Sequence, residues 1–229
     1  MLKKFVLLDL DDTIYDFHKA EHIALKKTLQ TFGLEPHTDV LTRYSEINAA
    51  QWRLLEQGEL TRDELKERRY RLLFEEFGID LDPIKAARTY ERNLSIGHYF
   101  IDGAEELLET LHREFDLYLV SNGSVDIQRP RIASGNIDRF FCGIFISEAV
   151  GFNKPDAAFF EAVFAQIPGF EKEKAVIIGD SLSSDIQGGK NVGITTVWFH
   201  PSGKTTGITP YADYQIRTLD ELPNLLRSL

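Results

Sequence analysis

Short apolar runs alternate with helix-like segments along the second half of the chain. Each run is short enough for one buried strand, and the runs lie at residues 117–120, 143–146, 175–178 and 195–199. Helix patterns occupy the segments around them, at residues 102–114, 125–134, 157–166, 186–191 and 219–226. Pro130 falls inside one of these patterns, where proline is unfavourable. The alternation predicts an α/β fold, a doubly wound, Rossmann-like parallel sheet with helices on both faces.

The first part of the chain has a different pattern. An apolar run at residues 4–10 predicts one more strand, buried on both faces, and from about residue 17 to residue 97 only helix patterns follow. Thr61 and Glu64 form a capping box, and Asp82-Pro83 begins another helix. We therefore expect a core domain made of residues 1–15 and 98–229, interrupted after its first strand by a helical cap domain, residues 16–97.

Polar side chains follow each of the first four predicted strands. They are Asp9, Asp11, Asp12 and Thr13; then Ser121, Asn122 and Gly123; then Lys154-Pro155 at the start of a helix; then Gly179-Asp180, with Asp185 five residues on. Ligands of open parallel sheets bind beyond the carboxyl ends of the strands. We therefore expect several carboxylates, a hydroxyl group and a lysine to meet at one edge of the sheet.

This collection of groups favours phosphoryl chemistry with a metal ion. Two like charges about 4 Å apart repel by about 4 kcal/mol at an effective dielectric constant near 20, so clustered carboxylates need a cation. Carboxylate oxygens without nearby cysteine or histidine favour Mg²⁺. Lysine, hydroxyl and the backbone N–H groups of the Asn122-Gly123 turn would bind a phosphoryl group. One aspartate is then available as a nucleophile and another for proton transfer.

The same residues resemble the four ordered motifs of the haloacid dehalogenase-like superfamily, and the helical insertion resembles its C1-type cap. The resemblance implies that Asp9 is a nucleophile that forms an aspartyl-phosphate, and that Asp11 protonates the leaving alkoxide and then activates water. It implies Mg²⁺ bound by Asp9, by the backbone carbonyl of Asp11, by Asp180, and by Asp185 directly or through water. Ser121 and Lys154 would hold phosphoryl oxygens beside the N–H groups of Asn122 and Gly123.

Two features favour a phosphatase within that superfamily. The dehalogenase branch lacks an equivalent of Asp11, and the sugar-phosphate mutase branch usually has Asp-Gly-Val where this chain has Asp12-Thr13-Ile14. Residues 8–17 and 51–58 resemble bacterial pyrimidine 5′-nucleotidases, which hydrolyse nucleoside monophosphates. On this interpretation the base would meet side chains of the cap, with Phe17, Tyr44, Trp52 and Arg53 as candidates. The alternative is a sugar-phosphate or phosphoglycolate phosphatase with a different cap pocket.

Two hypotheses come from other classes of protein. A non-catalytic, phospho-accepting signalling module would also combine a doubly wound sheet with acidic residues and a lysine, but receiver domains place the phosphoacceptor after the third strand and have no insertion after the first. The segment His18-Lys19-Ala20-Glu21-His22 fits the pattern of inverted zinc proteases. No third zinc ligand is evident, so solvated histidines on a helix are the simpler interpretation.

Composition narrows the expected partners and location. The chain has 36 acidic and 26 basic residues and a net charge of −10, which argues against nucleic acid or an anionic membrane as a partner. A small phosphomonoester is the expected partner, and the oligomeric state is left open. Cys142 is the single cysteine, which fits a reducing, cytoplasmic location, and its neighbours Phe140 and Phe141 suggest that it is buried. The apolar run before Asp9 is too short for an export signal.

Overall fold

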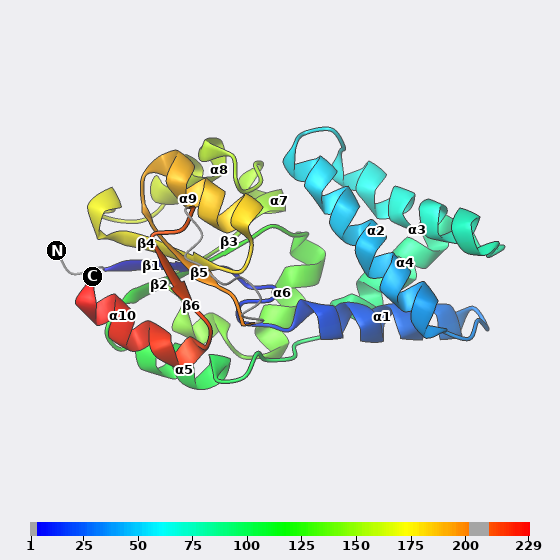
Figure 1. The fold of residues 1–229 in the computed structure, drawn as a ribbon, viewed down its shortest axis with the longest axis horizontal. Coiled ribbons are helices and arrows are strands. Elements are labelled where there is room, and N and C mark those ends of the chain that lie inside the picture. The colour runs from blue at the N-terminus through cyan, green and yellow to red at the C-terminus, as the bar shows by residue number, and fades with distance from the viewer. Residues whose placement is uncertain (1–3, 202–210) are drawn as a thin grey trace.

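The computed structural model describes residues 4–201 and 211–229, and its core is one six-stranded parallel sheet (Figure 1). The strands are β1 Phe5–Leu8, β2 Asp116–Ser121, β3 Gly143–Ile146, β4 Ala175–Gly179, β5 Thr195–Phe199 and β6 Tyr214–Ile216, in the order β3-β2-β1-β4-β5-β6. The five predicted strands are confirmed. Strand β6 was not predicted because it is three residues long, lies at the sheet edge and buries Ile216 alone.

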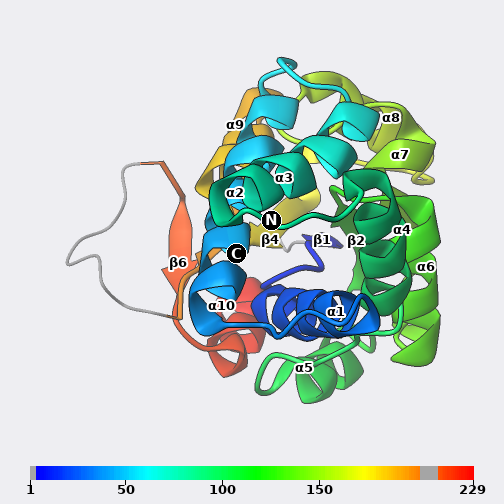
Figure 2. The ribbon, with the colours of Figure 1, turned by 90° about the vertical axis from the view of Figure 1, so that its right-hand side faces the viewer.

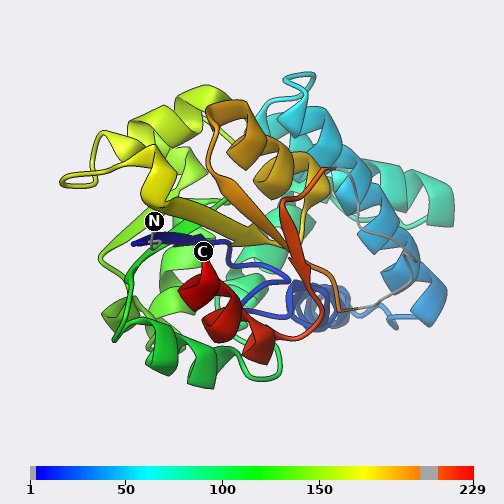
Figure 3. The same cartoon turned by 60° about the vertical axis from the view of Figure 1, so that its left-hand side comes forward.

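Helices cover both faces of the sheet, which confirms the doubly wound fold (Figure 3). In β1, Phe5 and Leu7 face one side and Val6 and Leu8 the other, and all four are buried, as a central parallel strand requires. One face packs against α8 (Ala157–Phe164) and α9 (Gln187–Val192), and the other against α5 (Ala104–Leu111), α6 (Val125–Ser134) and α10 (Leu222–Ser228). The remaining short helical elements are α7 Ser147–Val150, Asp138–Phe140, Lys172–Lys174, Leu182–Ile186 and Leu219–Glu221.

Four helices lie between β1 and α5 in the chain and stand beyond the carboxyl ends of the strands (Figures 1 and 2). They are α1 Phe17–Thr31, α2 Thr38–Glu56, α3 Arg62–Phe77 and α4 Pro83–Leu94. The capping box of Thr61 and Glu64 and the Asp82 N-cap both form as predicted. These helices share a hydrophobic cluster whose buried members all lie between residues 20 and 94. We therefore propose that the cap domain of residues 16–97 is a unit with its own core, inserted into a domain of residues 1–15 and 98–229.

Two linkers join the helical insertion to the sheet, and they pair with each other. Tyr15 and Phe100 form an antiparallel bridge, and the N–H of Asp16 donates to the carbonyl of Tyr99 at 2.7 Å. The hydroxyl of Tyr15 donates to the carbonyl of Arg131 in α6 at 3.3 Å. The paired linkers therefore rest directly on α6.

One local prediction was wrong, and for Tyr44 the structure favours the core over the ligand site. Cys142 is exposed, because it lies in the turn before β3 with its backbone, not its side chain, directed at the sheet: its N–H donates to the carbonyl of Leu117. Tyr44 is fully buried among the four helices and donates to the hydroxyl of Tyr70, so it does not face a ligand site. Helix α6 continues through Pro130. In the described part of the chain, no helix is long and apolar enough to cross a membrane.

Candidate active site

The predicted polar side chains converge at the carboxyl edge of the sheet. Asp9 follows β1 directly, Ser121 is the last residue of β2, and Asp180 follows β4 directly. The N–H of Asp9 donates to the carbonyl of Ile178 in β4 at 3.0 Å. Hydrogen bonding within the sheet therefore fixes the position of the Asp9 backbone. After Leu10 the chain turns, with Asp12 at a φ of 58°, and the Asp12 carboxylate accepts the N–H of Phe17 at the start of α1.

Lys154 is the centre of the site. Its ammonium donates to Asp9 Oδ1 at 2.6 Å, to Asp185 Oδ1 at 2.6 Å and to the carbonyl of Val120 at 2.9 Å. These three acceptors use all three N–H groups of the ammonium. The side chain is 1% exposed, and although its burial opposes the charge, the two carboxylates hold the pKa of Lys154 above its usual range.

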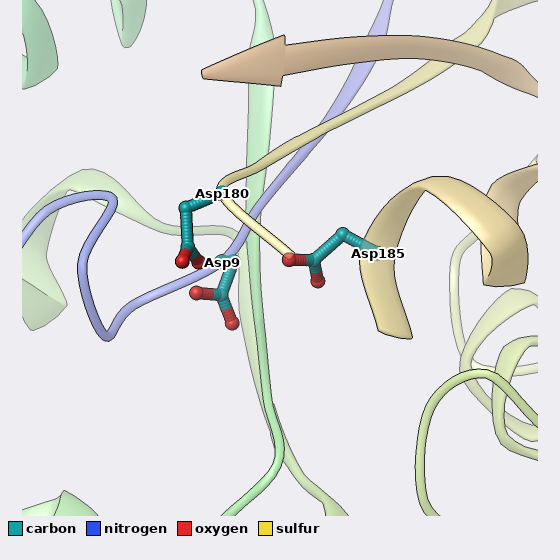
Figure 4. Close-up of side chains that lie close together, drawn as sticks. All are labelled: Asp9, Asp180 and Asp185. Carbon is teal, nitrogen blue, oxygen red and sulfur yellow. The ribbon is translucent and has the colours of Figure 1, made fainter. Parts of the chain in front are cut away.

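Asp9, Asp180 and Asp185 form an acidic trio (Figure 4). One carboxylate oxygen from each lies within 4.8 Å of the others. Burial raises the pKa of Asp9 to about 8, with Asp185 adding to the rise and Lys154 opposing it. Burial, then Asp9 and Asp185, also raise the pKa of Asp180. Hard oxygen ligands that repel one another in a buried site suit Mg²⁺. Asp185 is the least available of the three for a metal ion. Its Oδ1 accepts from Lys154, and its Oδ2 accepts the N–H of Ser181 at 3.1 Å.

Asp11 stands apart from the trio and is bound to helix α6. Its Oδ1 accepts from Arg131 Nη1 at 2.6 Å and its Oδ2 from Gln128 Nε2 at 2.7 Å. Gln128 Nε2 also donates to Ser121 Oγ, at 2.9 Å. Neither α6 residue was predicted from the sequence: their i, i+3 spacing places them on one helix face, but it does not show which strand end that face meets.

The Ser121-Asn122-Gly123 turn is arranged differently from its prediction. Asn122 exchanges two hydrogen bonds of 2.8 Å with the backbone N–H and carbonyl of Lys154, so its side chain fixes the lysine. The N–H of Gly123 donates to Ser147 Oγ at 3.1 Å, so it is already paired and is not free to bind a phosphoryl group as predicted. Glycine is required here, since a Cβ would lie 2.8 Å from Gln128 Cγ.

The site opens into two adjoining spaces. An open cleft is lined by the acidic trio, Lys154 and Ser121, together with cap residues Phe17, Trp52 and Glu56. A narrower cavity shares Asp11, Asn122, Phe17 and Trp52 with the cleft and extends between the cap and α6. We name it the leaving-group cavity, and its other lining residues include Arg62, Leu65, Arg69, Glu91, Ile127 and Arg131.

Phe17 and Trp52 lie where they were predicted, but Arg53 does not. Arg53 is exposed and lines neither space, because successive helix residues point about 100° apart and its neighbour Trp52 faces inward. Arg62 takes the position instead: its guanidinium lies 5.7 Å from the Trp52 ring. Its Nη2 donates across to the core, to Ser147 Oγ at 2.8 Å and Asn153 Oδ1 at 2.7 Å. Glu56 ends α2 and Arg62 begins α3, on either side of the turn between these helices. Neither residue was predicted from the sequence to lie at the site.

The structure contradicts the two hypotheses from other classes. His18 and His22 are exposed, whereas Glu21 is buried and accepts from Ser45 and Asn48, so the three do not converge on zinc. Within residues 4–201 and 211–229, the acidic trio is the one set of His, Cys, Asp or Glu side chains close enough to share an ion. A receiver-like module is also excluded, because β3 is followed by Ser147 rather than an aspartate.

Comparisons with known proteins agree with this geometry. Residues 6–199 match the family model described as haloacid dehalogenase-like hydrolase. The HAD-hydrolase YfnB of Bacillus subtilis is 40% identical over 96% of this chain and 94% of its own, and the pyrimidine 5′-nucleotidase PynA of Streptococcus pneumoniae is 37% identical over 99% and 96%. The crystal structure of YfnB bound to magnesium superposes with a TM-score of 0.92 and 38% identity, covering 99% of both chains. The chain therefore belongs to the haloacid dehalogenase-like hydrolase family.

Proposed function

We propose that the protein is a Mg²⁺-dependent phosphomonoester hydrolase that acts through an aspartyl-phosphate on pyrimidine nucleoside monophosphates. The observation that carries the proposal is the position of Lys154, buried between Asp9 and Asp185 and next to Asp180, at the floor of an open cleft. A phosphoryl group in this cleft would meet a carboxylate, an ammonium and the hydroxyl of Ser121 together.

In the first step, the Asp9 carboxylate attacks phosphorus, and the bond between phosphorus and the leaving oxygen breaks. Asp11 gives its proton to that oxygen, so the alcohol leaves neutral. Ser121 donates its hydroxyl to a non-bridging oxygen while charge builds there, and Lys154 does the same by exchanging its contact with Asp9, whose oxygen is then bonded to phosphorus, for a phosphoryl oxygen. In the second step, water attacks the phosphorus of the aspartyl-phosphate, Asp11 accepts its proton, and the Asp9 carboxylate is released with inorganic phosphate.

The acidic trio fits Mg²⁺, which would offset the charge of the phosphoryl group when bound. Asp9 and Asp180 would hold the ion together with the backbone carbonyl of Asp11, and Asp185 would do so directly or through water. YfnB, which is similar over its whole length, binds magnesium in its crystal structure, and this supports the assignment.

The leaving-group cavity supports a nucleoside as the alcohol. Phe17 and Trp52 offer aromatic rings, with the Arg62 guanidinium over the Trp52 ring at 5.7 Å, and such groups bind planar bases. Buried guanidinium nitrogens of three lining residues, Arg62 Nη1, Arg69 Nε and Arg131 Nη2, have no hydrogen-bond partner among residues 4–201 and 211–229. Buried donors of this kind need acceptors, and the carbonyl oxygens of a pyrimidine would supply them. The likeness to the pyrimidine 5′-nucleotidase PynA points to the same substrate.

A second candidate, a phosphoglycolate-type phosphatase, rests on the same arginines, because a carboxylate would also satisfy them. The deciding experiment measures phosphate release from UMP, dUMP, dTMP, phosphoglycolate and several sugar phosphates, with Mg²⁺ and with excess EDTA. We expect Mg²⁺-dependent release with the highest kcat/KM on the pyrimidine nucleotides. A maximum on phosphoglycolate or a sugar phosphate would keep the chemistry and overturn the nucleotidase. Wild-type turnover in EDTA, or full turnover by Asp9→Asn, would overturn the mechanism.

We also infer a cytoplasmic location and a small phosphomonoester as the main partner. The single cysteine fits a reducing compartment. The net charge of −10 would repel nucleic acids and anionic lipid surfaces.

A further inference from the structure

The carboxyl group of Asp11 is held from two sides by helix α6. Arg131 Nη1 donates to one of its oxygens at 2.6 Å and Gln128 Nε2 to the other at 2.7 Å. The two holding residues also bind each other, since Arg131 Nη1 donates to Gln128 Oε1 at 2.7 Å. This contact fixes the orientation of the amide: with its oxygen and nitrogen exchanged, an acceptor would face Asp11 and a donor would face Arg131.

Arg131 also contacts both linkers between the cap and the core. Its Nε donates to the carbonyl of Gly97 at 2.7 Å, in the linker that leaves the cap. Its guanidinium carbon lies 5.5 Å from the ring of Tyr15 and 6.0 Å from that of Phe17, in and just after the linker that enters the cap. One side chain therefore joins Asp11 to both connections of the cap.

Stability alone is a weak explanation for this arrangement. The Arg131 side chain is 0% exposed, and a buried ion pair adds little to stability compared with apolar residues of the same volume. What such a pair does provide is a fixed geometry. Gln128 links this geometry to the phosphoryl site as well, because its Nε2 is shared between Asp11 and Ser121 Oγ.

We propose that Arg131 and Gln128 are positioning residues that set the orientation of the Asp11 carboxyl for proton transfer to the leaving oxygen. The inference rests on the proposed function, in which Asp11 is the general acid. A carboxylate offers about four acceptor sites, and the two α6 donors use two of them, one on each oxygen. One of the remaining sites would carry the proton that Asp11 gives to the leaving oxygen, and, once that proton is gone, would accept one from water, in the cavity that both α6 residues line.

The test compares two leaving groups. The alkoxide of a nucleoside needs a proton to depart, whereas p-nitrophenolate departs readily without one. Because Asp11 also serves the second step, which is the same for both substrates, the quantity compared is the rate of aspartyl-phosphate formation, followed before the steady state. Asp11→Asn is measured first as the reference: we expect this rate to fall roughly 10²–10⁴-fold with dUMP and much less with p-nitrophenyl phosphate. If positioning is the role of the α6 pair, Arg131→Met and Gln128→Met give the same contrast in this rate. Gln128→Met should leave KM for dUMP unchanged, whereas Arg131→Met also removes Nη2 from the cavity and should raise KM as well. Arg131→Lys keeps the charge and should recover part of the activity on dUMP.

Arg129→Met is the matched control, because Arg129 is exposed on the same helix, and its kinetics should equal those of the wild type. Equal losses on both substrates by Arg131→Met and Gln128→Met would overturn the inference and assign the pair a structural role. Unchanged turnover of dUMP by these variants would also overturn it. Circular dichroism shows whether Arg131→Met folds. If it does not, the contrast between the two substrates in Gln128→Met tests the positioning role. Should Asp11→Asn itself show no contrast between the substrates, the general-acid assignment fails, and this failure is distinct from failure of the α6 pair alone.

Discussion

Lys154 and Asp9 are 145 residues apart in the chain, and yet the lysine ammonium lies 2.6 Å from the aspartate carboxylate with both side chains buried. The contact is made possible by topology. Parallel strands β1, β2 and β4 end at the same edge, and the Asn122 side chain at the end of β2 holds the backbone of Lys154. The ammonium thus lies between the proposed nucleophile and a candidate metal ligand, where it limits repulsion within the acidic trio.

Lys154→Met should destabilise the metal-free protein strongly. The substitution leaves Asp9 and Asp185 buried without their cation, and removing one partner of a buried ion pair costs about 3–5 kcal/mol. Urea unfolding in EDTA at about pH 8.5, above the pKa of about 8 at which Asp9 loses its proton, measures the free energy of unfolding. Lys174→Met is the control: its partner Glu171 is 51% exposed, so the loss should stay below about 1 kcal/mol. A similarly small loss for Lys154→Met would show that the trio does not depend on the lysine.

The metal-free protein should lose stability as the pH rises, and Mg²⁺ should reverse the loss. Burial raises the pKa of Asp9 to about 8, above the value of about 3.9 in an unfolded chain. The folded state therefore binds more protons across this window, and the resulting stability is fully present below about pH 4 and lost as the pH rises through about 8.

Mg²⁺ binds the deprotonated carboxylates, so the increase in Tm that it causes should be larger at about pH 8.5 than at about pH 5.5. At about 100 times Kd, the gain in the free energy of unfolding is about 2.7 kcal/mol. Thermal melts with MgCl₂, against NaCl of equal ionic strength, measure the difference. An equal Mg²⁺ effect at both pH values would contradict the raised pKa of Asp9.

The residues at strand ends could be predicted because one rule determines them. In a parallel sheet, whatever follows an apolar run lies at the carboxyl edge, so Asp9, Ser121 and Asp180 were identified without knowledge of packing. Asp11 was also identified, but its partners were not. Gln128 and Arg131 lie on a helix 117 and 120 residues further along the chain, and no local pattern states which strand end that helix approaches.

Side chains of the cap were harder to predict, because their direction depends on how each helix is rotated against its neighbours. Trp52 and Arg53 are adjacent, and only one of them can face the site. Packing of α2 against the other cap helices buries Ile47, Gln51 and Leu55 and leaves Arg53 exposed. The arginine that does reach the site, Arg62, begins the next helix, and its contacts with Ser147 and Asn153 exist only once the cap and core meet.

Arg62→Met should weaken the binding of nucleotides. The change removes a charged donor that lines the leaving-group cavity and lies over the Trp52 ring, and hydrogen bonds to charged groups contribute about 1.5–3 kcal/mol, so KM for dUMP should rise on the order of tenfold or more. Steady-state kinetics measure the change. Arg53→Met, at the exposed neighbour of Trp52, should leave KM unaltered. If Arg53→Met raised KM and Arg62→Met did not, the assignment of the cavity would be wrong.

Gly135→Ala should destabilise the junction between α6 and the linkers. The φ of Gly135, −81°, suits any residue, but a Cβ there would lie 1.9 Å from the hydroxyl oxygen of Tyr15, and overpacking of this kind costs about 1–3 kcal/mol. Tyr15→Phe removes that oxygen and one hydrogen bond to the carbonyl of Arg131, at a cost of about 0.5–1.5 kcal/mol. In the double variant the added methyl group no longer meets the hydroxyl. The loss in the free energy of unfolding of the double variant should therefore be clearly smaller than the sum of the losses of the two single variants. A double-mutant cycle in urea unfolding tests this, and strict additivity would show that the helix moves away from Tyr15 instead of pressing against it.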